Sequence, residues 1–551
     1  MAHALPPTWL IPSILGISTH LGFFIHSDIE KHAVFIANCF VFWPALGLAL
    51  IVILGYRDAA QWVGTAVLSY EASLLISIAV YRYFFHALGG FPGPRLARIS
   101  ALWSFKSAAV EAKWHVRVKE LHGEYGDVVR IKPREISIND PAAIKDIYGV
   151  GATCVKGPFY DLMYPHRSLQ MARDRGYHSK RRRLWDRGFS SKGLFHMLSL
   201  AGYEPYILEH CRVLVTLISS RGTQAQEATE LIDDFAWDSM GILAFGKSFN
   251  MLHGSPPKML KMMREIGRGA SLLVCASWVV IFLRNMVGVR YATEKWLEWC
   301  AQEVEERRKR GGELARRDLF SYLIEDTTSD NDHTPTGTDG DLVRDSELAM
   351  AAGSDTTAST LSALLYLLAQ HPDKQQRLRQ EMESAVPADE EPSHAALIGK
   401  PYLEGCINEG LRLYPAVLSG LQRETGPEGL RTAGVYIPPQ TIVSVPTYTI
   451  HRDPRNFGSP DEFIPERWSS QPELVIRKEA LIPFSTGTYS CAGRPFAMME
   501  MRLWVFTMVR HFDIQFPPGE GKESLDTLGG TGAQDCFTTH IPRYHLVFKK
   551  R

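Results

Sequence analysis

Residues 484–495 read FSTGTYSCAGRP, and a helical pattern begins directly after them. Cys491 therefore stands just before the start of a helix, where backbone amides carry partial positive charge and favour a thiolate. Gly487 and Gly493 let the backbone approach a flat ligand without a clash from Cβ atoms. A lone cysteine in such a turn is more often buried and inert. Whether Cys491 binds a metal therefore depends on the rest of the chain.

The composition of the chain excludes several classes of protein. Its 551 residues are 45% hydrophobic and 22% charged, which provides enough apolar material for a large core and a membrane segment. The 60 basic residues balance the 60 acidic ones, so the net charge indicates no nucleic acid or polyanionic partner. The eight cysteines are dispersed without a CxxC pair, which argues against a disulfide scaffold or a structural zinc site and fits a reducing compartment. They are Cys39, Cys154, Cys211, Cys275, Cys300, Cys406, Cys491 and Cys536.

Three apolar stretches open the chain, at residues 9–24, 33–54 and 60–80. A helix needs about 20 apolar residues to cross a membrane, which the second stretch provides most cleanly. We therefore expect a membrane anchor of one to three transmembrane segments within residues 1–89. A cleaved signal peptide is the alternative, but it would need an early basic region, and no Lys or Arg precedes Lys31.

Behind the leader, the chain has the pattern of one mainly helical domain. The segment Phe91-Pro92-Gly93-Pro94 restricts the backbone and predicts a stiff hinge, so we place the domain at residues 90–551. Residues 126–138 have the alternation of a β-hairpin, and helical periodicity dominates from about residue 170 to residue 415. Residues 326–341 are polar and predict a solvated loop within this helical region. Short strands rich in Pro and Gly follow, so the fold class is mainly α, α+β.

Basic residues gather behind the third apolar stretch. This bias places the domain on the cytoplasmic side of the membrane. The residues are Arg82, Arg95, Arg98 and Lys106.

The sequence AGSDTT at residues 352–357 interrupts a helical segment that runs from about Asp341 to Ala369. Such a run of weak helix formers violates local consistency, which often marks a functional site. Threonine hydroxyls can bind carbonyls one turn back, and Gly353 removes bulk, so a groove could widen here. An ordinary bend with an exposed acid is the alternative.

Two charged motifs lie between this helix and Cys491. Glu409 and Arg412 stand three residues apart on a helix and can pair. Exposed pairs of this kind contribute only about 0 to 1 kcal/mol, so the pair alone says nothing about activity. The sequence PERW at residues 465–468 follows, and it carries Arg467.

Together these motifs resemble the cytochrome P-450 family of heme-thiolate monooxygenases. The loop pattern F-x-x-G-x-x-x-C-x-G, AGSDTT, E-x-x-R and PERW stand in family order, and the resemblance extends from the FPGP hinge to near the C terminus. The forms FSTGTYSCAGRPFAMME and HSKRRRLWDRGFS look most similar to membrane-bound fungal biosynthetic members. The resemblance implies the cytochrome P-450 fold, with a helical heme domain and a small β region.

The resemblance also assigns roles to residues. Cys491 is the axial ligand of the iron of heme b, in a loop that includes Phe484, Gly487 and Gly493. Asp355 and Thr356 relay protons to dioxygen, while the thiolate favours cleavage of the O–O bond. The trio of Glu409, Arg412 and Arg467 forms a structural lock that positions the cysteine loop.

Further residues resemble family positions that hold the heme propionates. They are His178, Arg182 and Arg423. The family usually has Arg or His at the place of Tyr489, which can donate only one hydrogen bond. For Arg181 and Arg183 a solvated basic face is at least as good an interpretation. By resemblance, the substrate pocket includes residues 160–169, Met350, Ala351, residues 416–418 and residues 529–531.

The function implied is insertion of one oxygen atom from dioxygen into an apolar small molecule, in a secondary-metabolite pathway. Because the chain has no dinucleotide fingerprint, electrons must come from NADPH through a separate reductase or a cytochrome b-type donor. The expected location is the endoplasmic reticulum membrane, with the catalytic domain facing the cytosol. A heme-binding protein without turnover would not need AGSDTT. An isomerase or dehydratase usually has altered relay residues, and a small multi-pass transporter would lack the large domain.

Overall fold

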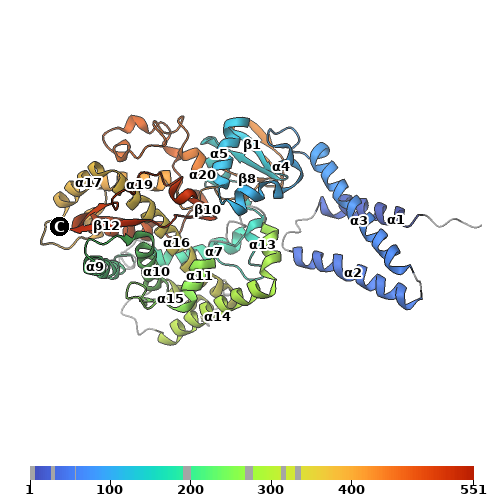
Figure 1. The fold of residues 1–551 in the computed structure, drawn as a ribbon, viewed down its shortest axis with the longest axis horizontal. Coiled ribbons are helices and arrows are strands. Elements are labelled where there is room, and N and C mark those ends of the chain that lie inside the picture. Colours follow the sequence, from blue (N-terminus) through green and yellow to red (C-terminus); the bar gives the residue numbers. More distant parts are fainter. Residues whose placement is uncertain are drawn as a thin grey trace, which may run out of the picture.

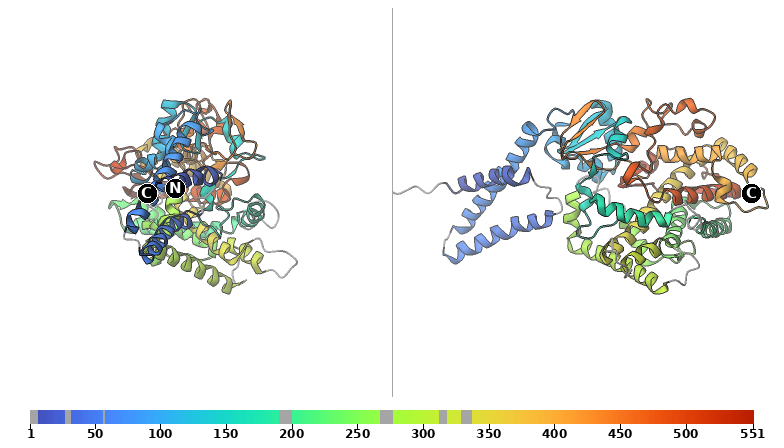
Figure 2. Two further views of the ribbon diagram at one scale, coloured as in Figure 1. Left: turned by 90° about the vertical axis from the view of Figure 1, so that its right-hand side faces the viewer. Right: turned by 180° about the vertical axis from the view of Figure 1, so that it is seen from behind.

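The computed structural model describes residues 7–26, 32–55, 58–189, 200–266, 277–311, 318–328 and 337–551. It consists of a helical body with a small β region, and three apolar helices extend from one end (Figure 1). Figure 2 shows the same leader seen from behind, with the C terminus at the opposite end of the molecule. This architecture confirms the predicted mainly α, α+β class.

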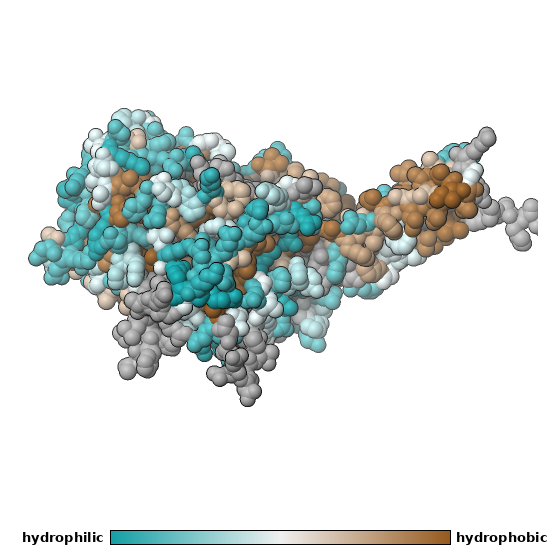
Figure 3. Space-filling model, turned by 90° about the horizontal axis from the view of Figure 1, so that it is seen from below, coloured by the Kyte–Doolittle hydropathy of each residue, from teal (hydrophilic) through white to brown (hydrophobic). Residues whose placement is uncertain are grey.

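The leader contains α1 (Leu10–Thr19), α2 (Ala33–Ile53) and α3 (Ala59–Val80). Within the described part of the chain, two helices are long and apolar enough to cross a membrane, Ala33–Ile53 and Ala59–Phe85. Their apolar side chains form the large brown surface at the end of the molecule in Figure 3. The predicted number of spans stays a prediction. The predicted domain boundary near residue 90 stays a prediction.

Helix α1 packs against α3 through a close and partly polar contact. The Nδ1 atom of His20 lies 2.8 Å from the hydroxyl oxygen of Ser77. A Cβ atom on Gly16 would lie only 2.4 Å from the carbonyl oxygen of Tyr70. Glycine at this position therefore lets the two helices approach closely.

Helix α2 reaches the helical body through α13 (Ser277–Arg284). Val280 and Ile281 of α13 pack in one apolar cluster with Ala33 and Val34 of α2. Figure 1 shows these two helices beside each other. The leader therefore contacts the body at a point far along the chain, in addition to the covalent connection.

The predicted hairpin at residues 126–138 is present. It consists of β1 (Val128–Lys132) and β2 (Glu135–Ile138), which pair antiparallel. The hairpin is one edge of a five-stranded sheet in the order β1-β2-β8-β5-β3. The other strands are β3 (Val155–Lys156), β5 (Arg423–Glu424) and β8 (Ile442–Ser444).

Three smaller sheets complete the β region, as expected for the C-terminal part of the chain. One is three-stranded, and two are hairpins. Their strands are β4 (Gln226–Glu227), β12 (His545–Lys550) and β9 (Phe512–Gln515); β10 (Gln534–Cys536) and β11 (Thr538–His540); and β6 (Leu430–Thr432) and β7 (Val435–Ile437).

Long helices form most of the body, which confirms the helical pattern predicted from about residue 170 to residue 415. The longer ones are α5 (Trp114–Tyr125), α7 (Arg175–Phe189), α9 (Glu204–Ser220), α10 (Ala228–Phe245), α11 (Lys258–Ile266), α14 (Val287–Arg310), α15 (Leu319–Thr328), α16 (Asp339–Gln370), α17 (Pro372–Ala385), α19 (Pro401–Leu413) and α21 (Arg494–His511). Short ones are α4 (Arg95–Ile99), α6 (Ala142–Tyr148), α18 (His394–Leu397) and α20 (Thr447–His451).

Helix α16 runs through the centre of the body. It begins with a capping box in which the Asp341 amide donates to the Thr338 hydroxyl, and the Thr338 amide donates to the Asp341 carboxylate. Its C-terminal half is buried against α10 and the other helices of the main core. Of the polar stretch expected to be a loop, residues 329–336 lie outside the described residues, and the remainder ends α15 and begins α16.

Candidate active site

A cavity of about 280 Å³ lies inside the helical body, lined by α16, α7 and the loop that carries Cys491. Most of its wall is apolar, and no Asp or Glu is among its lining residues in the described part of the chain. Typical apolar lining residues are Leu243, Leu348, Ala349, Leu411, Val417, Leu421, Phe484, Phe496 and Met501. An apolar cavity with few polar groups is the usual form of a small-molecule site.

Cys491 lines this cavity, and its side chain has accessible surface there although it lies inside the protein. Its amide donates to the carbonyl oxygen of Phe484 at 2.9 Å, which closes the loop ahead of α21. Burial raises the pKa of the thiol, although the amides of Gly493 and Arg494 and the charge of Arg182 act to lower it. The predicted effect of the helix start is therefore present but outweighed by burial. A bound metal cation would reverse this balance.

The two glycines of the loop have different surroundings. Gly493 lines the cavity, and a Cβ atom there would make only ordinary contacts with Phe189 and Cys491. Gly487 has a φ of +68°, and a Cβ atom there would lie 2.0 Å from the carbonyl oxygen of Tyr148. Gly487 is outside the cavity lining, so it seats the loop against α6 instead of approaching a ligand.

The segment AGSDTT lies on the wall of the cavity, within an α16 that continues as helix throughout. The Thr356 hydroxyl donates to the carbonyl oxygen of Ala352 at 2.6 Å, as its sequence position predicts. Gly353 makes room for Met240 of α10, because a Cβ atom would lie 2.4 Å from the Met240 sulfur. Thr356 lines the cavity, whereas Asp355 is half-buried next to it and is not among the lining residues.

A group of basic residues lines the same cavity. His178 and Arg182 come from α7 and Arg423 comes from β5, so the structure brings together the three residues expected near the propionates. Lys156 of β3 joins them and was missed by the sequence interpretation. It is buried, and burial, followed by the charges of Arg423 and Arg182, lowers its pKa well below the usual value. Its only sequence signal is a lysine in a short β-prone segment.

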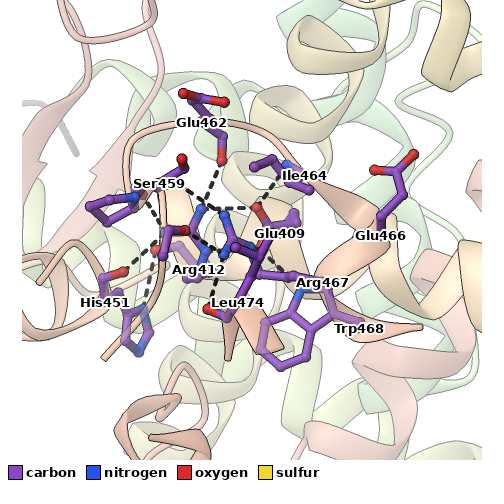
Figure 4. A network of polar contacts seen from close by, with 12 residues as sticks. Glu409, Arg412, His451, Ser459, Glu462, Ile464, Glu466, Arg467, Trp468 and Leu474 are labelled. Carbon is purple, nitrogen blue, oxygen red and sulfur yellow. Dashed lines mark hydrogen bonds and ion pairs between the residues drawn. The ribbon is translucent and has the colours of Figure 1, made fainter. Parts of the chain in front are cut away.

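The trio expected to form a lock is assembled and buried (Figure 4). Arg412 and Glu409 form an ion pair with an N–O distance of 2.8 Å, and Arg467 lies 2.9 Å from the same carboxylate. All three side chains are fully buried. The indole nitrogen of Trp468 and the amide of Ile464 also donate to Glu409.

His451 connects this trio to the segment that leads into the cysteine loop. Its Nε2 atom accepts a hydrogen bond from the Ile482 amide at 3.0 Å, so its Nδ1 atom carries the proton and donates to the carbonyl oxygen of Arg412. Burial, with the nearby charge of Arg412, lowers the pKa of His451 to about 3. A neutral imidazole therefore joins the lock to the residues just before Phe484, and no motif in the sequence pointed to it.

Arg181 differs from the expected basic surface. Its side chain is fully buried and forms an ion pair of 2.6 Å with Asp345 of α16. The amide of Leu169 also donates to Asp345. Arg181 therefore attaches α7 and the loop before it to α16, whereas Arg183 is exposed as expected.

The expected pocket residues agree with the cavity in part. Tyr160 and Leu169 line it, and so do Ala416 and Val417, but Leu418 does not. The predicted Met350 and Ala351 do not line the cavity. On α16 it is lined instead by Leu348, Ala349, Ala352, Gly353, Thr356, Thr357 and Thr360. Residues 529–531 are also outside the lining.

The cavity fits a heme. Heme b is flat and apolar, with two carboxylates at one edge and an iron that accepts a thiolate. The cavity offers a sulfur, apolar walls and a group of cations. In addition, three buried polar atoms at the cationic group have no hydrogen-bond partner within the described protein: Nδ1 of His178, Nε of Arg423 and the hydroxyl of Tyr489. Such atoms are costly to bury unless a ligand satisfies them.

Comparison with known proteins also identifies a family that fits this cavity. The sequence model of the family Cytochrome P450 matches residues 92–546. Cytochrome P450 monooxygenase nodW of Hypoxylon pulicicidum is 44% identical over 98% of this chain and 98% of its own length. Cytochrome P450 monooxygenase FCK2 of Fusarium pseudograminearum is 35% identical over 99% and 98%. Tryprostatin B 6-hydroxylase of Aspergillus fumigatus is 32% identical over 98% and 95%.

The chain therefore belongs to the cytochrome P450 family. It is a monooxygenase, an oxidoreductase that incorporates oxygen from dioxygen, as its relatives are named.

Proposed function

We propose that the chain uses heme b, with Cys491 as the axial thiolate, to hydroxylate an apolar small molecule in a fungal secondary-metabolite pathway. The observation that carries the proposal is that the Cys491 sulfur and Thr356 line one apolar cavity together with a group of cations. The relative named Tryprostatin B 6-hydroxylase supports hydroxylation as the reaction. When bound, the heme supplies activation of dioxygen, and the thiolate ligand favours cleavage of the O–O bond.

The protein contributes binding, orientation and proton supply. The single proton of the Thr356 hydroxyl is used in its hydrogen bond to Ala352, so Thr356 presents a lone pair to the cavity. It can therefore orient a water molecule there by accepting a hydrogen bond from it. We propose that Asp355, which is next to Thr356 in the chain, supplies the protons that replace those consumed in the cavity.

The partners follow from the same chemistry. Electrons are supplied by NADPH through a separate reductase, or by a cytochrome b-type donor. The two apolar leader helices support a location in a membrane, which we propose to be the endoplasmic reticulum with the body facing the cytosol. An apolar substrate suits the cavity because most of the surface of its wall is apolar and no carboxylate lines it in the described part of the chain.

The first test is the reduced carbon-monoxide spectrum of the purified chain. Wild-type protein should show the red-shifted band of thiolate ligation, and Cys491→Ala should abolish it. Cys39→Ala is the matched control, because Cys39 lies in the leader helix α2 and should leave the band unchanged. A band that survives in Cys491→Ala would refute the ligand assignment.

The second test addresses the proton supply. Thr356→Ala and Asp355→Asn should keep the carbon-monoxide band but consume NADPH with little product, at roughly one tenth of the coupling of wild type. Thr360→Ala is the matched control, because Thr360 lines the same cavity and makes the same type of hydrogen bond one turn further along α16. Full coupling in the Thr356 and Asp355 variants would remove both residues from the relay.

A further inference from the structure

The ring of Tyr489 lies among the cations of the cavity. The Lys156 nitrogen is 4.8 Å from the centre of the ring, and the guanidinium carbon of Arg423 is 5.0 Å from it. The imidazole of His178 meets the ring edge-on at 4.6 Å. Distances of this kind allow cation–π attraction, which is strongest where water is excluded.

The sheet creates the need for such a contact. Lys156 of β3 and Arg423 of β5 are direct partners across the antiparallel pair. Like charges in this position repel each other. Both side chains are buried, and in the described residues neither forms an ion pair with a carboxylate. Two buried basic groups are therefore held side by side without a counterion from the protein, which contributes to the lowered pKa of Lys156.

Each basic group has further contacts but keeps an unused donor; Lys156 also lies 5.3 Å from the ring centre of Tyr160, and Arg423 lies 5.1 Å from that of Tyr148. The Lys156 nitrogen donates to the carbonyl oxygens of Leu169 and Gln170, which leaves one of its three protons free. Arg423 donates through Nη1 to Tyr160 and Gln422, and its buried Nε has no partner within the described protein. The unused donors, with the buried hydroxyl of Tyr489, are suited to an anion in the cavity.

We propose that Tyr489 is a positioning residue for the heme propionates, which holds Lys156 and Arg423 by its ring. This inference rests on the proposed function, because it requires that heme occupies the cavity. The electron-rich ring face attracts both cations and reduces the cost of their proximity, and it does so without adding charge. The hydroxyl adds a neutral donor to the same anionic groups. An arginine at this place would instead put another positive charge beside Lys156 and Arg423.

The experiment measures how fast heme leaves the full-length protein to excess apomyoglobin, for wild type, Tyr489→Phe and Tyr489→Leu. Because the ring carries the effect, Tyr489→Phe should lose heme at most about twice as fast as wild type, and Tyr489→Leu roughly tenfold faster. The midpoint potential of the heme should fall in Tyr489→Leu, because cations that are less well placed stabilise the propionates less.

Two comparisons separate this role from simple packing. Tyr436→Leu is the matched control, because Tyr436 makes a cation–π contact with Arg431 at 5.4 Å on an exposed hairpin, and it should leave heme loss unchanged. In addition, the effect of Tyr489→Leu should be clearly smaller in a Lys156→Met background than in wild type. Equal effects in both backgrounds would show that Tyr489 does not act through Lys156.

The outcomes distinguish this inference from the proposed function. If wild-type protein binds no heme with a thiolate band, both fall. If its band is normal and Tyr489→Leu keeps heme as tightly as wild type, only the role of Tyr489 falls. The role of Tyr489 also falls if Tyr489→Arg retains heme more tightly than wild type. That result would show that a positive charge at this position holds heme better than the tyrosine ring does.

Discussion

Two groups of buried charges in this protein differ in whether a carboxylate of the protein pairs with them. The lock of Glu409, Arg412 and Arg467 has its carboxylate and both guanidinium groups paired at 2.8 to 2.9 Å. The cations Lys156 and Arg423 are equally buried, but the described residues offer them no carboxylate. Charges that are paired within the protein maintain its architecture, whereas charges left without a partner indicate where an ionic ligand binds.

The carbonyl oxygens around the lock support this distinction. Arg412 donates to the carbonyl oxygens of His451 and Glu462 as well as to Glu409, and Arg467 donates to that of Gly458. With its bonds to Glu409, Arg412 uses its donors within the protein. Arg467 donates through both Nη atoms to carbonyl oxygens, and its Nε lies 2.9 Å from Glu409 as an ion pair. A side chain whose donors are all used has little capacity left for a ligand.

The largest effect is expected from breaking the lock with Glu409→Gln. Arg412 and Arg467 would keep their charges in a buried site without a counterion, which should cost about 3 to 5 kcal/mol of stability. Denaturant unfolding of the heme-free and heme-bound protein should show the loss in both. Glu462→Gln is the control, since only the backbone of Glu462 contacts Arg412. Unchanged unfolding in Glu409→Gln would contradict the view that pairing maintains the architecture.

Substitution of the two loop glycines should distinguish an effect on the stability of the protein from an effect on heme binding. Gly487→Ala places a Cβ atom against the Tyr148 carbonyl at a positive φ, so we expect a loss of about 1 to 3 kcal/mol even without heme. Gly493→Ala should leave the heme-free protein unchanged and weaken heme binding, because its Cβ atom would enter the cavity. Thermal unfolding with and without heme measures both. Equal effects of the two substitutions on the heme-free protein would remove the distinction.

Lys156→Met should behave in the opposite way to the lock variant. Without heme, replacing an unpaired buried cation by an apolar side chain should leave stability equal or higher. With heme, one of the cations near the propionates is lost, and transfer of heme to apomyoglobin should be roughly fivefold faster. A heme-free Lys156→Met protein that is clearly less stable than wild type would show that Lys156 belongs to the architecture.

Glu500 belongs neither to the lock nor to the pair of Lys156 and Arg423, and its substitution should have the smallest effect on stability. It is fully buried on α21, and burial raises the pKa of its carboxyl to about 8, although Ser239 and Thr357 act to lower it. Because this pKa lies above the ordinary value of 4.5, the folded chain binds a proton that the unfolded chain releases. The stability that Glu500 contributes is therefore fully present below pH 4.5 and is lost as the pH rises through about 8.

Glu500→Gln should remove this pH dependence. In a chain of this length a few kcal/mol moves Tm by only a few degrees. The Tm difference between Glu500→Gln and wild type should grow in favour of the variant from pH 5 to pH 8.5. A difference that stays constant with pH would show that Glu500 does not change its protonation on folding.

The sequence was most informative where function depends on local pattern. The hairpin at residues 126–138, the long helix around AGSDTT and the helix after Cys491 were all predicted within a few residues, because each depends on periodicity or on a short motif. The lock was also predicted as a set, since its motifs stand in family order. The family resemblance thus gave the identity of these residues, and the structure gave their distances.

Residues that depend on distant pairing could not be predicted. Lys156 became part of the site only because β3 pairs with β5 and places it opposite Arg423. For Arg181 a solvated face is at least as good an interpretation from the sequence, since nothing in α7 shows that Asp345 approaches from α16. Met350 and Ala351 were expected in the pocket, but the rotation of α16 about its axis, which depends on packing against elements distant in the chain, turns Leu348, Ala349 and Ala352 to the cavity instead. In each case the deciding partner is far away in the chain.

The contact between α2 and α13 has a practical consequence for producing this enzyme. Val280 and Ile281 are covered in part by Ala33 and Val34 of the leader. A shortened chain that starts near residue 90 would leave this surface bare, next to the exposed side chains of Trp278 and Phe282. Such a soluble version should self-associate unless detergent, or polar substitutions on α13, replace the missing helix.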